Sequence, residues 1–233
     1  MSPRLAGKRV LILGAETEVG RAVTTAVAEA GASVASVAAT SDAEAAFAVQ
    51  RLARQLSSGG RRVIAQAIDA TNEAAVRVMV RQVSKELGGL DAVILCEPPL
   101  ERPAPSGPVD DPQLRERMFQ EMDRNIREAS DRNSATFDRF SKYAGRELDR
   151  YGGGPLIVAS DSSSIALIGA EGEPLPKWWL EEVSYRDKPI EKVVRDVLRA
   201  ITSRGLWWKA AKVTPRPLLP AYRLLARLLM RNR

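Results

Sequence analysis

The stretch RVLILGAETEVG at residues 9–20 decides the fold class. Residues 9–14 are a short, mostly apolar run that ends in glycine, which is typical of a buried strand. Residues 19–30 then match a helix, and Gly31 ends it. A buried strand that leads through a glycine turn into a helix begins a βαβ unit. These residues therefore predict a parallel sheet covered by helices.

The same alternation continues along the chain. Further strands are predicted at 33–38, 62–68, 91–96 and 156–159, and further helices at 42–56, 72–87, 113–150 and 190–201. Residues 206–213 are the candidate for a sixth strand. We therefore predict an α/β fold, a Rossmann-type doubly wound parallel sheet of about six strands with helices on both faces. Residues 1–215 form this domain, and residues 216–233 follow it as a basic amphipathic helix.

The composition excludes several kinds of chemistry. The 233 residues include no histidine and a single cysteine, Cys96. Without histidine there is no Ser-His-Asp or Cys-His nucleophile and no histidine metal ligand. One cysteine allows neither an intrachain disulfide nor a cysteine-cluster zinc site, so we expect no metal.

The net charge of +6 comes from the end of the chain. From Arg204 to Arg233 there are eight basic residues and no acidic ones, so the first 203 residues carry 27 basic against 29 acidic side chains. We therefore expect no nucleic-acid binding by the domain. No stretch reaches the roughly 18 apolar residues of a membrane span, and the N-terminus lacks the apolar core of a secretory signal. The expected location is the cytoplasm.

The order of the elements and their motifs resembles the short-chain dehydrogenase/reductase family, especially its 3-oxoacyl carrier-protein reductase-like members. The resemblance runs from about residue 8 to residue 215. Matching segments are 14–20 for the family's glycine-rich turn, 69–71 for its D-V-T, 90–94 for L-D-x-L-V, 153–158 for the approach to the catalytic serine, and 202–205 for the start of the sixth-strand segment. The resemblance implies an NAD(P)-binding oxidoreductase fold.

The resemblance assigns five candidate cofactor-binding residues, which are Gly14, Glu18, Gly20, Thr40 and Asp69. The family's turn holds a pyrophosphate at a helix N-terminus. Here Glu18 stands in the place of the middle glycine and Glu16 precedes it, and two carboxylates repel a pyrophosphate. We therefore expect Glu18 or Glu16 to take the place of the phosphate at the helix N-terminus. The alternative is that both side chains point to solvent.

The end of the second predicted strand has no acidic side chain. It consists of Ala38, Ala39 and Thr40, whereas an acidic residue there accepts the ribose hydroxyls of NAD. We expect weak dinucleotide binding or none, with NADP favoured over NAD if one binds.

The resemblance also assigns a catalytic set of Asn, Ser, Tyr and Lys, in which the tyrosine is the acid/base. Asn133 falls at the asparagine position, and the candidates for tyrosine and lysine are Tyr185 and Lys188. The serine position falls on Asp161, and a shift of one residue would put Ser162 there. The family's Tyr-x-x-x-Lys motif is absent, because Tyr185 and Lys188 are three residues apart and Ser184 falls at the tyrosine position. On a helix a slip of one residue turns a side chain by about 100°. After the fourth predicted strand, where the family has N-N-A-G, Glu97 adds a third carboxylate near the cofactor cleft.

Three functions follow from these departures. The first is a non-catalytic scaffold or accessory subunit that docks through residues 216–233. The second is an NADP-dependent oxidoreductase with a shifted site made of Asn133, a serine among 160–164, Tyr185 and Lys188. The third is a nucleotide-binding sensor without turnover. The sequence specifies no substrate, partner or oligomeric state.

The tail combines an apolar surface with a basic stripe. Arg223, Arg227 and Arg231 are four residues apart among several leucines. Three placements stay open: the helix folds back as core, docks on a protein partner or second copy, or lies on an anionic membrane surface.

Liposome flotation separates the membrane placement from the other two. That placement predicts that the full chain floats with vesicles containing anionic lipid and that a variant lacking residues 216–233 does not, because the basic apolar helix supplies the affinity. Equal flotation of both forms would remove the membrane placement.

Overall fold

The computed structural model describes residues 4–58, 60–100, 112–161 and 178–202. The chain divides into two compact units, Met1–Ile201 and Thr202–Arg233. The candidate strand at 206–213, the tail at 216–233 and Ser162 lie outside the described residues.

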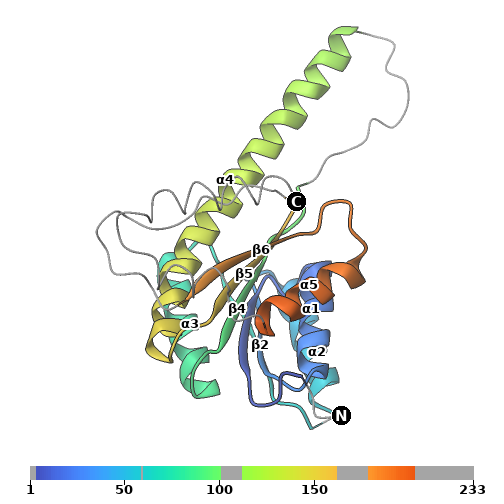
Figure 1. The fold of residues 1–233 in the computed structure, drawn as a ribbon. Helices are drawn as coiled ribbons and strands as arrows, with labels where there is room; N and C mark the ends of the chain where they lie inside the picture. Colours follow the sequence, from blue (N-terminus) through green and yellow to red (C-terminus); the bar gives the residue numbers. More distant parts are fainter. Residues whose placement is uncertain (1–3, 59, 101–111, 162–177, 203–233) are drawn as a thin grey trace, which may run out of the picture. The chain divides into compact units, whose positions relative to one another are not determined.

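Six parallel strands form one sheet (Figure 1). They are β1 (Arg9–Leu13), β2 (Ser33–Ala38), β3 (Val63–Ala67), β4 (Ala92–Cys96), β5 (Pro155–Ser160) and β6 (Trp179–Ser184). Their order in the sheet is β3-β2-β1-β4-β5-β6. The order reverses between β1 and β4, and doubly wound sheets bind ligands beside this switch point, at the carboxyl ends of the strands. The predicted fold class is confirmed.

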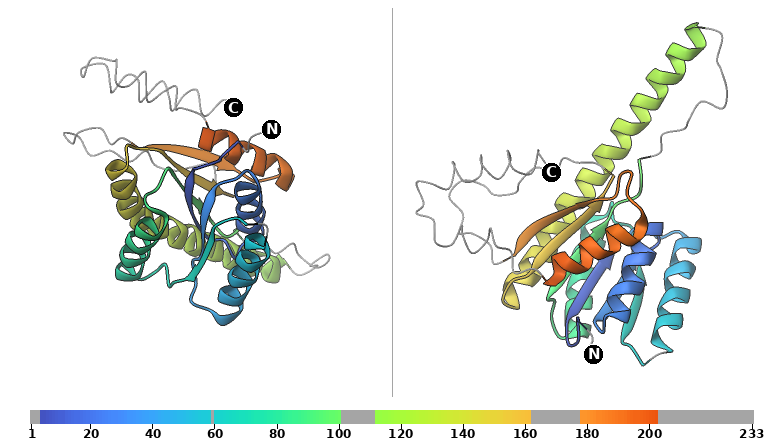
Figure 2. Two further views of the ribbon diagram at one scale, coloured as in Figure 1. Left: turned by 90° about the horizontal axis from the view of Figure 1, so that it is seen from below. Right: turned by 45° about the vertical axis from the view of Figure 1, so that its right-hand side comes forward.

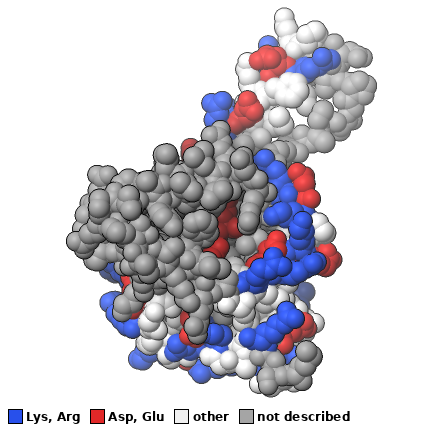
Figure 3. Space-filling view, viewed as in Figure 1, with Lys and Arg blue, Asp and Glu red and all other residues white. Residues whose placement is uncertain are grey.

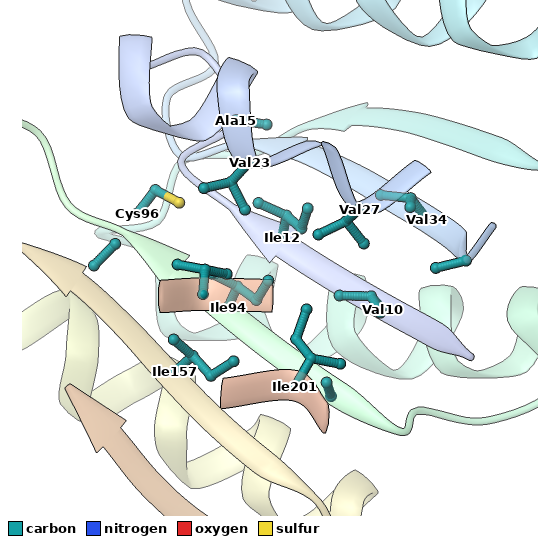
Figure 4. Close-up of a cluster of buried hydrophobic side chains, with 14 of the residues drawn as sticks. Val10, Ile12, Ala15, Val23, Val27, Val34, Ile94, Cys96, Ile157 and Ile201 are labelled. Carbon is teal, nitrogen blue, oxygen red and sulfur yellow. The ribbon is translucent and has the colours of Figure 1, made fainter. Parts of the chain in front are cut away.

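Helices cover both faces of the sheet (Figure 2). On one face lie α1 (Glu18–Glu29), α2 (Ala43–Ser57) and α5 (Ile190–Thr202), and on the other lie α3 (Glu73–Leu87) and α4 (Pro112–Arg150). Figure 4 shows the first of the two cores, where Ile12 and Ile94 of the sheet meet Val23 of α1 and Ile201 of α5. Because side chains alternate along a strand, neighbouring residues of β1 and β4 pack into opposite cores. Both strands are therefore apolar throughout their buried length.

β6 corrects the predicted order of elements. The family resemblance predicts a helical register for residues 184–188 and a sixth-strand segment that begins at 202–205. In the structure, Trp179–Ser184 pair in parallel with β5, and Ser184 lies opposite Ser160. The sequence WLEEVS does not alternate cleanly between apolar and polar residues, so it gives a weak strand signal. Burial against β5 and α5 decides the conformation, as the 6% exposure of Val183 shows.

The helix α4 has two different halves. Its C-terminal half buries Phe137, Phe140 and Leu148 in the second core, beside α3. Its N-terminal half exposes apolar side chains, among them Leu114 and Phe119. Basic and acidic side chains are interspersed along the visible part of the described surface, α4 included (Figure 3). The C-terminal half of α4 therefore packs in the second core, whereas the N-terminal half leaves apolar side chains exposed.

The turn between β1 and α1 packs backbone against backbone. Gly14 has φ of 85°, and a Cβ atom there would lie 2.0 Å from the carbonyl oxygen of Cys96 on β4. A Cβ atom on Gly20 would lie 2.0 Å from the carbonyl oxygen of Gly14. Both approaches require glycine, so this turn keeps the geometry that dinucleotide-binding turns need.

Replacing Gly14 with alanine should open this turn. Gly60 is a matched control, because it has a similar φ of 76° but no atom within 4 Å of a built Cβ. We expect Gly60→Ala to lower the free energy of unfolding by about 1 kcal/mol through backbone strain alone, and Gly14→Ala to lower it by about 3 kcal/mol or more through added overlap. Urea unfolding of both variants measures the difference. Equal losses in the free energy of unfolding would show that the backbone at Cys96 shifts to accommodate the added methyl group at no measurable cost.

Candidate functional site

Thr17 caps the N-terminus of α1 at the switch point. Its hydroxyl accepts a hydrogen bond from the Gly20 N–H at 2.9 Å and donates one to the Gly14 carbonyl at 2.8 Å. The expectation that Glu16 or Glu18 caps this helix is therefore wrong. A threonine directly before a helix reaches the third helical N–H without stretching, whereas Glu18 is the first helical residue and is exposed. The threonine was recognisable in the sequence as a capping residue.

Glu16 instead reaches the end of β2. Its two carboxylate oxygens lie 3.0 and 3.1 Å from the Ala39 nitrogen and accept a hydrogen bond from that N–H. Burial raises the pKa of Glu16, although the backbone hydrogen bonds partly oppose that rise. A carboxylate thus lies beside the residue that follows β2, where the sequence of the strand end itself shows none.

Two backbone donors remain at the start of α1. Within the described part of the chain, the N–H groups of Glu18 and Val19 have no hydrogen-bond partner. Free N–H groups at a helix N-terminus bind anions. The exposed side chain of Glu18 adds a negative charge beside them.

The other two candidate cofactor residues lie at the ends of β2 and β3. Thr40 is exposed and its hydroxyl accepts from the Asp42 N–H at 3.2 Å. The carboxylate of Asp69 accepts from the N–H and the hydroxyl of Thr71, and these bonds lower the pKa of Asp69. Both side chains lie at the carboxyl edge of the sheet, the edge at which this fold type binds ligands.

Tyr185 lies directly after β6 and not on a helix. Its hydroxyl donates to the carbonyl oxygen of Glu97 at 2.9 Å, and its N–H donates to the carbonyl of Ser160. Residues Tyr185 to Lys188 form a turn closed by the Lys188 N–H, in which Asp187 has φ of 55°. Burial, followed by the nearby Asp161 and Glu97, raises the pKa of Tyr185. This phenol is therefore a poorer acid than a free tyrosine.

Asp161 and Asn133 also converge on the ends of β4 and β5. Asp161 is 8% exposed, pairs with Arg186 at 3.3 Å and accepts from the Leu100 N–H at 3.3 Å. The Asn133 side chain on α4 donates a long hydrogen bond of 3.4 Å to the Pro98 carbonyl. The structure thus brings Asn133, Asp161 and Tyr185 to one edge of the sheet. Among the described interactions, the side chain of Lys188 makes no hydrogen bond to Tyr185.

Glu97 is the ionisable residue that stands out at this edge. It follows β4 directly and is 6% exposed. Burial and the charge of Glu182 on β6 raise the pKa of Glu97 to about 7. Within the described residues, its carboxyl group makes no hydrogen bond. By contrast Cys96, the residue before it, is buried in the first core, and burial raises the pKa of its thiol to about 12, so it is no nucleophile at neutral pH.

Two further features bear on the kind of site. Among residues 4–58, 60–100, 112–161 and 178–202, no cluster of three or more potential ligand side chains is arranged for a metal ion. In the same segments, no helix combines the length and the apolarity needed to cross a membrane.

Comparison with known proteins relates this chain to dehydrogenases. The family described as short chain dehydrogenase matches residues 8–123. That match includes the β1–α1 turn and the ends of β2, β3 and β4, and it ends before Asn133, Tyr185 and Lys188.

Individual relatives share part of the chain. Glycine betaine reductase ATRR of Emericella nidulans is 35% identical over 92 residues, which are 40% of this chain and 7% of that protein. A short chain dehydrogenase of Pseudocercospora fijiensis is 33% identical over 91 residues, which are 39% of this chain and 28% of that one. A solved short-chain type dehydrogenase/reductase from Mycobacterium ulcerans is 27% identical, with a TM-score of 0.50 over 67% of this chain and 52% of that chain. This chain therefore matches about half or less of each relative.

The raised pKa of Glu97 predicts a pH-dependent stability. Below its ordinary pKa of 4.5 the carboxyl is protonated in both states. Between that value and about 7 it is ionised in the unfolded chain but still protonated in the folded protein, so the free energy of unfolding falls as the pH rises through this range. The wild-type protein should therefore lose about 3 kcal/mol more free energy of unfolding than Glu97→Gln between about pH 4.5 and about pH 8.

Urea unfolding at the two pH values measures this loss. Glu191→Gln is the matched control, because Glu191 is exposed in the first turn of α5 and should keep the wild-type dependence. Parallel wild-type and Glu97→Gln curves would show that Glu97 is ionised in the folded protein throughout this range.

Proposed function

Because this chain belongs to the short-chain dehydrogenase/reductase family, we propose that it binds NAD or NADH across the carboxyl ends of β1, β2 and β4, and that Tyr185 does not exchange a proton with its substrate. This proposal departs from the scaffold role that the sequence favoured. It also departs from the expected preference for NADP.

The retained β1–α1 turn is the observation that carries the binding proposal. Gly14 and Gly20 make approaches that no other residue type allows, and the N–H groups of Glu18 and Val19 are free within the described residues. Tight glycine packing and free donors at a helix N-terminus are what a pyrophosphate requires. The charge of Glu18 weakens this attraction, but the side chain is exposed and screened by solvent.

Glu16 supports NAD over NADP. A carboxylate at the end of the second strand accepts hydrogen bonds from the ribose hydroxyls of NAD, and it repels the additional phosphate of NADP. The sequence of β2 shows no such group, but the Glu16 carboxylate lies against the Ala39 N–H. We assign it the ribose-binding role that the strand end lacks.

The position of Tyr185 argues against the family's use of tyrosine. Its hydroxyl is already a donor to the Glu97 carbonyl, and its pKa is raised. The family lowers the pKa of its tyrosine with a lysine four residues later, whereas here Lys188 follows after three residues in a turn. An acid/base with its pKa displaced upward transfers protons poorly near neutral pH.

Titration with NADH and with NADPH, followed by nucleotide fluorescence, tests the binding proposal. We expect NADH to bind more tightly than NADPH. Glu16→Gln should weaken NADH binding about tenfold, because a hydrogen bond to a charged group is replaced by one to a neutral amide, and it should not weaken NADPH binding. The control Glu29→Gln, exposed in the last turn of α1, should leave both affinities unchanged.

Two results would contradict the proposal. Tighter binding of NADPH than NADH would remove the role of Glu16. Binding of neither dinucleotide would remove the proposal as a whole and favour the scaffold or accessory role.

A further inference from the structure

Resting on the proposed binding of NADH, we infer that Glu97 is the proton donor and acceptor of this site and stands in the place of the family's tyrosine. The substrate class is an aldehyde or ketone. The inference rests on where Glu97 lies, on how its backbone is held and on what its carboxyl group lacks.

Glu97 lies at the switch point of the sheet. It follows β4, which is the neighbour of β1 on the side where the strand order reverses (Figure 1). The carbonyl of the preceding Cys96 is the atom against which Gly14 packs, so Glu97 begins where the dinucleotide turn touches β4. Ligands of doubly wound sheets bind in the crevice at this point.

The backbone of Glu97 is held from two neighbouring segments. Its N–H donates to the Ala159 carbonyl of β5 at 2.9 Å, and its carbonyl accepts from the Tyr185 hydroxyl after β6 at 2.9 Å. On the other side, the Asn133 amide of α4 reaches the carbonyl of the next residue, Pro98. A group anchored in this way needs little reorganisation when it reacts. Tyr185 and Asn133 thus position the main chain at Glu97 and Pro98.

A second buried glutamate, Glu147, has both a hydrogen bond and an ion pair, as expected of a structural carboxylate. Glu147 on α4 is 4% exposed, accepts from the Ser84 hydroxyl at 2.8 Å and pairs with Arg150 at 2.9 Å. Glu97 is equally buried, but within the described residues its carboxyl has neither a hydrogen bond nor an ion pair. An unpaired buried carboxyl lowers stability, and such groups are concentrated at functional sites.

The charges around Glu97 favour a protonated carboxyl at neutral pH. Glu182 of β6 acts on it directly, and Asp161 after β5 and Tyr185 after β6 lie at the same edge. Arg186, a basic residue described at this edge, is paired with Asp161. With a pKa of about 7, Glu97 can both donate and accept a proton near neutral pH.

The reaction then balances with NADH as the reductant. Bound NADH would supply a hydride that forms the C–H bond at the carbonyl carbon, while the C=O π pair moves to oxygen. That oxygen takes the proton of the Glu97 carboxyl, which gives an alcohol, NAD⁺ and the Glu97 carboxylate. The carboxylate regains its proton from water, and in the oxidative direction it accepts the proton of the alcohol.

The test is NADH oxidation by a panel of aldehydes, ketones and α-diketones over the pH range from about 5 to about 9. The wild-type kcat for reduction should fall as the pH rises through about 7, because only protonated Glu97 donates. Glu97→Gln should lower kcat by about a hundredfold or more and remove this ionisation, with the NADH affinity within about threefold of wild type. Glu97→Asp should restore part of the rate and an ionisation.

Two variants separate Glu97 from its neighbours. Glu191→Gln, exposed on α5, should keep the wild-type rate and profile. Tyr185→Phe should retain the ionisation near pH 7 at a reduced rate, because it removes a support of the Glu97 backbone and not the acid.

Three outcomes would overturn the inference while leaving the binding proposal in place. These are NADH binding without oxidation by any member of the panel, an unchanged pH profile in Glu97→Gln, and loss of the ionisation in Tyr185→Phe. Absence of NADH binding would instead overturn the proposed function itself.

Discussion

The contact of the Gly14 backbone with the carbonyl of Cys96 is the constraint on which the candidate site depends. It brings the β1–α1 turn against the end of β4 at a distance that excludes any side chain. The free N–H groups of α1 and the residue after Cys96 are thereby placed at one edge of the sheet. The proposed nucleotide binding and the proposed chemistry at Glu97 both depend on this closeness.

The two halves of the chain differ in how they relate to the family. The family match covers residues 8–123, which include β1 to β4 and their carboxyl ends. Beyond it, the described residues place Tyr185 and Lys188 in the turn after β6. The proposed dinucleotide site therefore lies within the matched segment, whereas Tyr185 lies outside it.

Carboxylates lie at three points of the carboxyl edge, with different consequences. Glu18 is exposed and stays near solvent. Glu16 satisfies a backbone donor at the end of β2. Glu97 is buried without a hydrogen bond in the described part of the chain, and its ionisation therefore carries the largest cost. The burial of each carboxylate and the hydrogen-bond donors within its reach, more than residue type, therefore decide how easily it ionises.

The sequence by itself determined five of the six described strands and the described helices α1 to α5. Short apolar runs, helical segments and glycine turns are local signals, and they predicted β1 to β5 and α1 to α5 within a few residues of their observed ends. The weak pattern of β6 was missed, since its pairing with β5 decides that conformation. Thr17 was within reach of the sequence as a helix cap and was overlooked.

Only the tertiary structure decided the partners of the site. The hydrogen bond between Glu16 and Ala39 spans 23 residues, and the one between Tyr185 and Glu97 spans 88. Spacing along the chain does not encode such contacts. They arise because the strand order β3-β2-β1-β4-β5-β6 brings distant strand ends together, and because burial between those strands, and not position in a motif, fixes the protonation of Glu97.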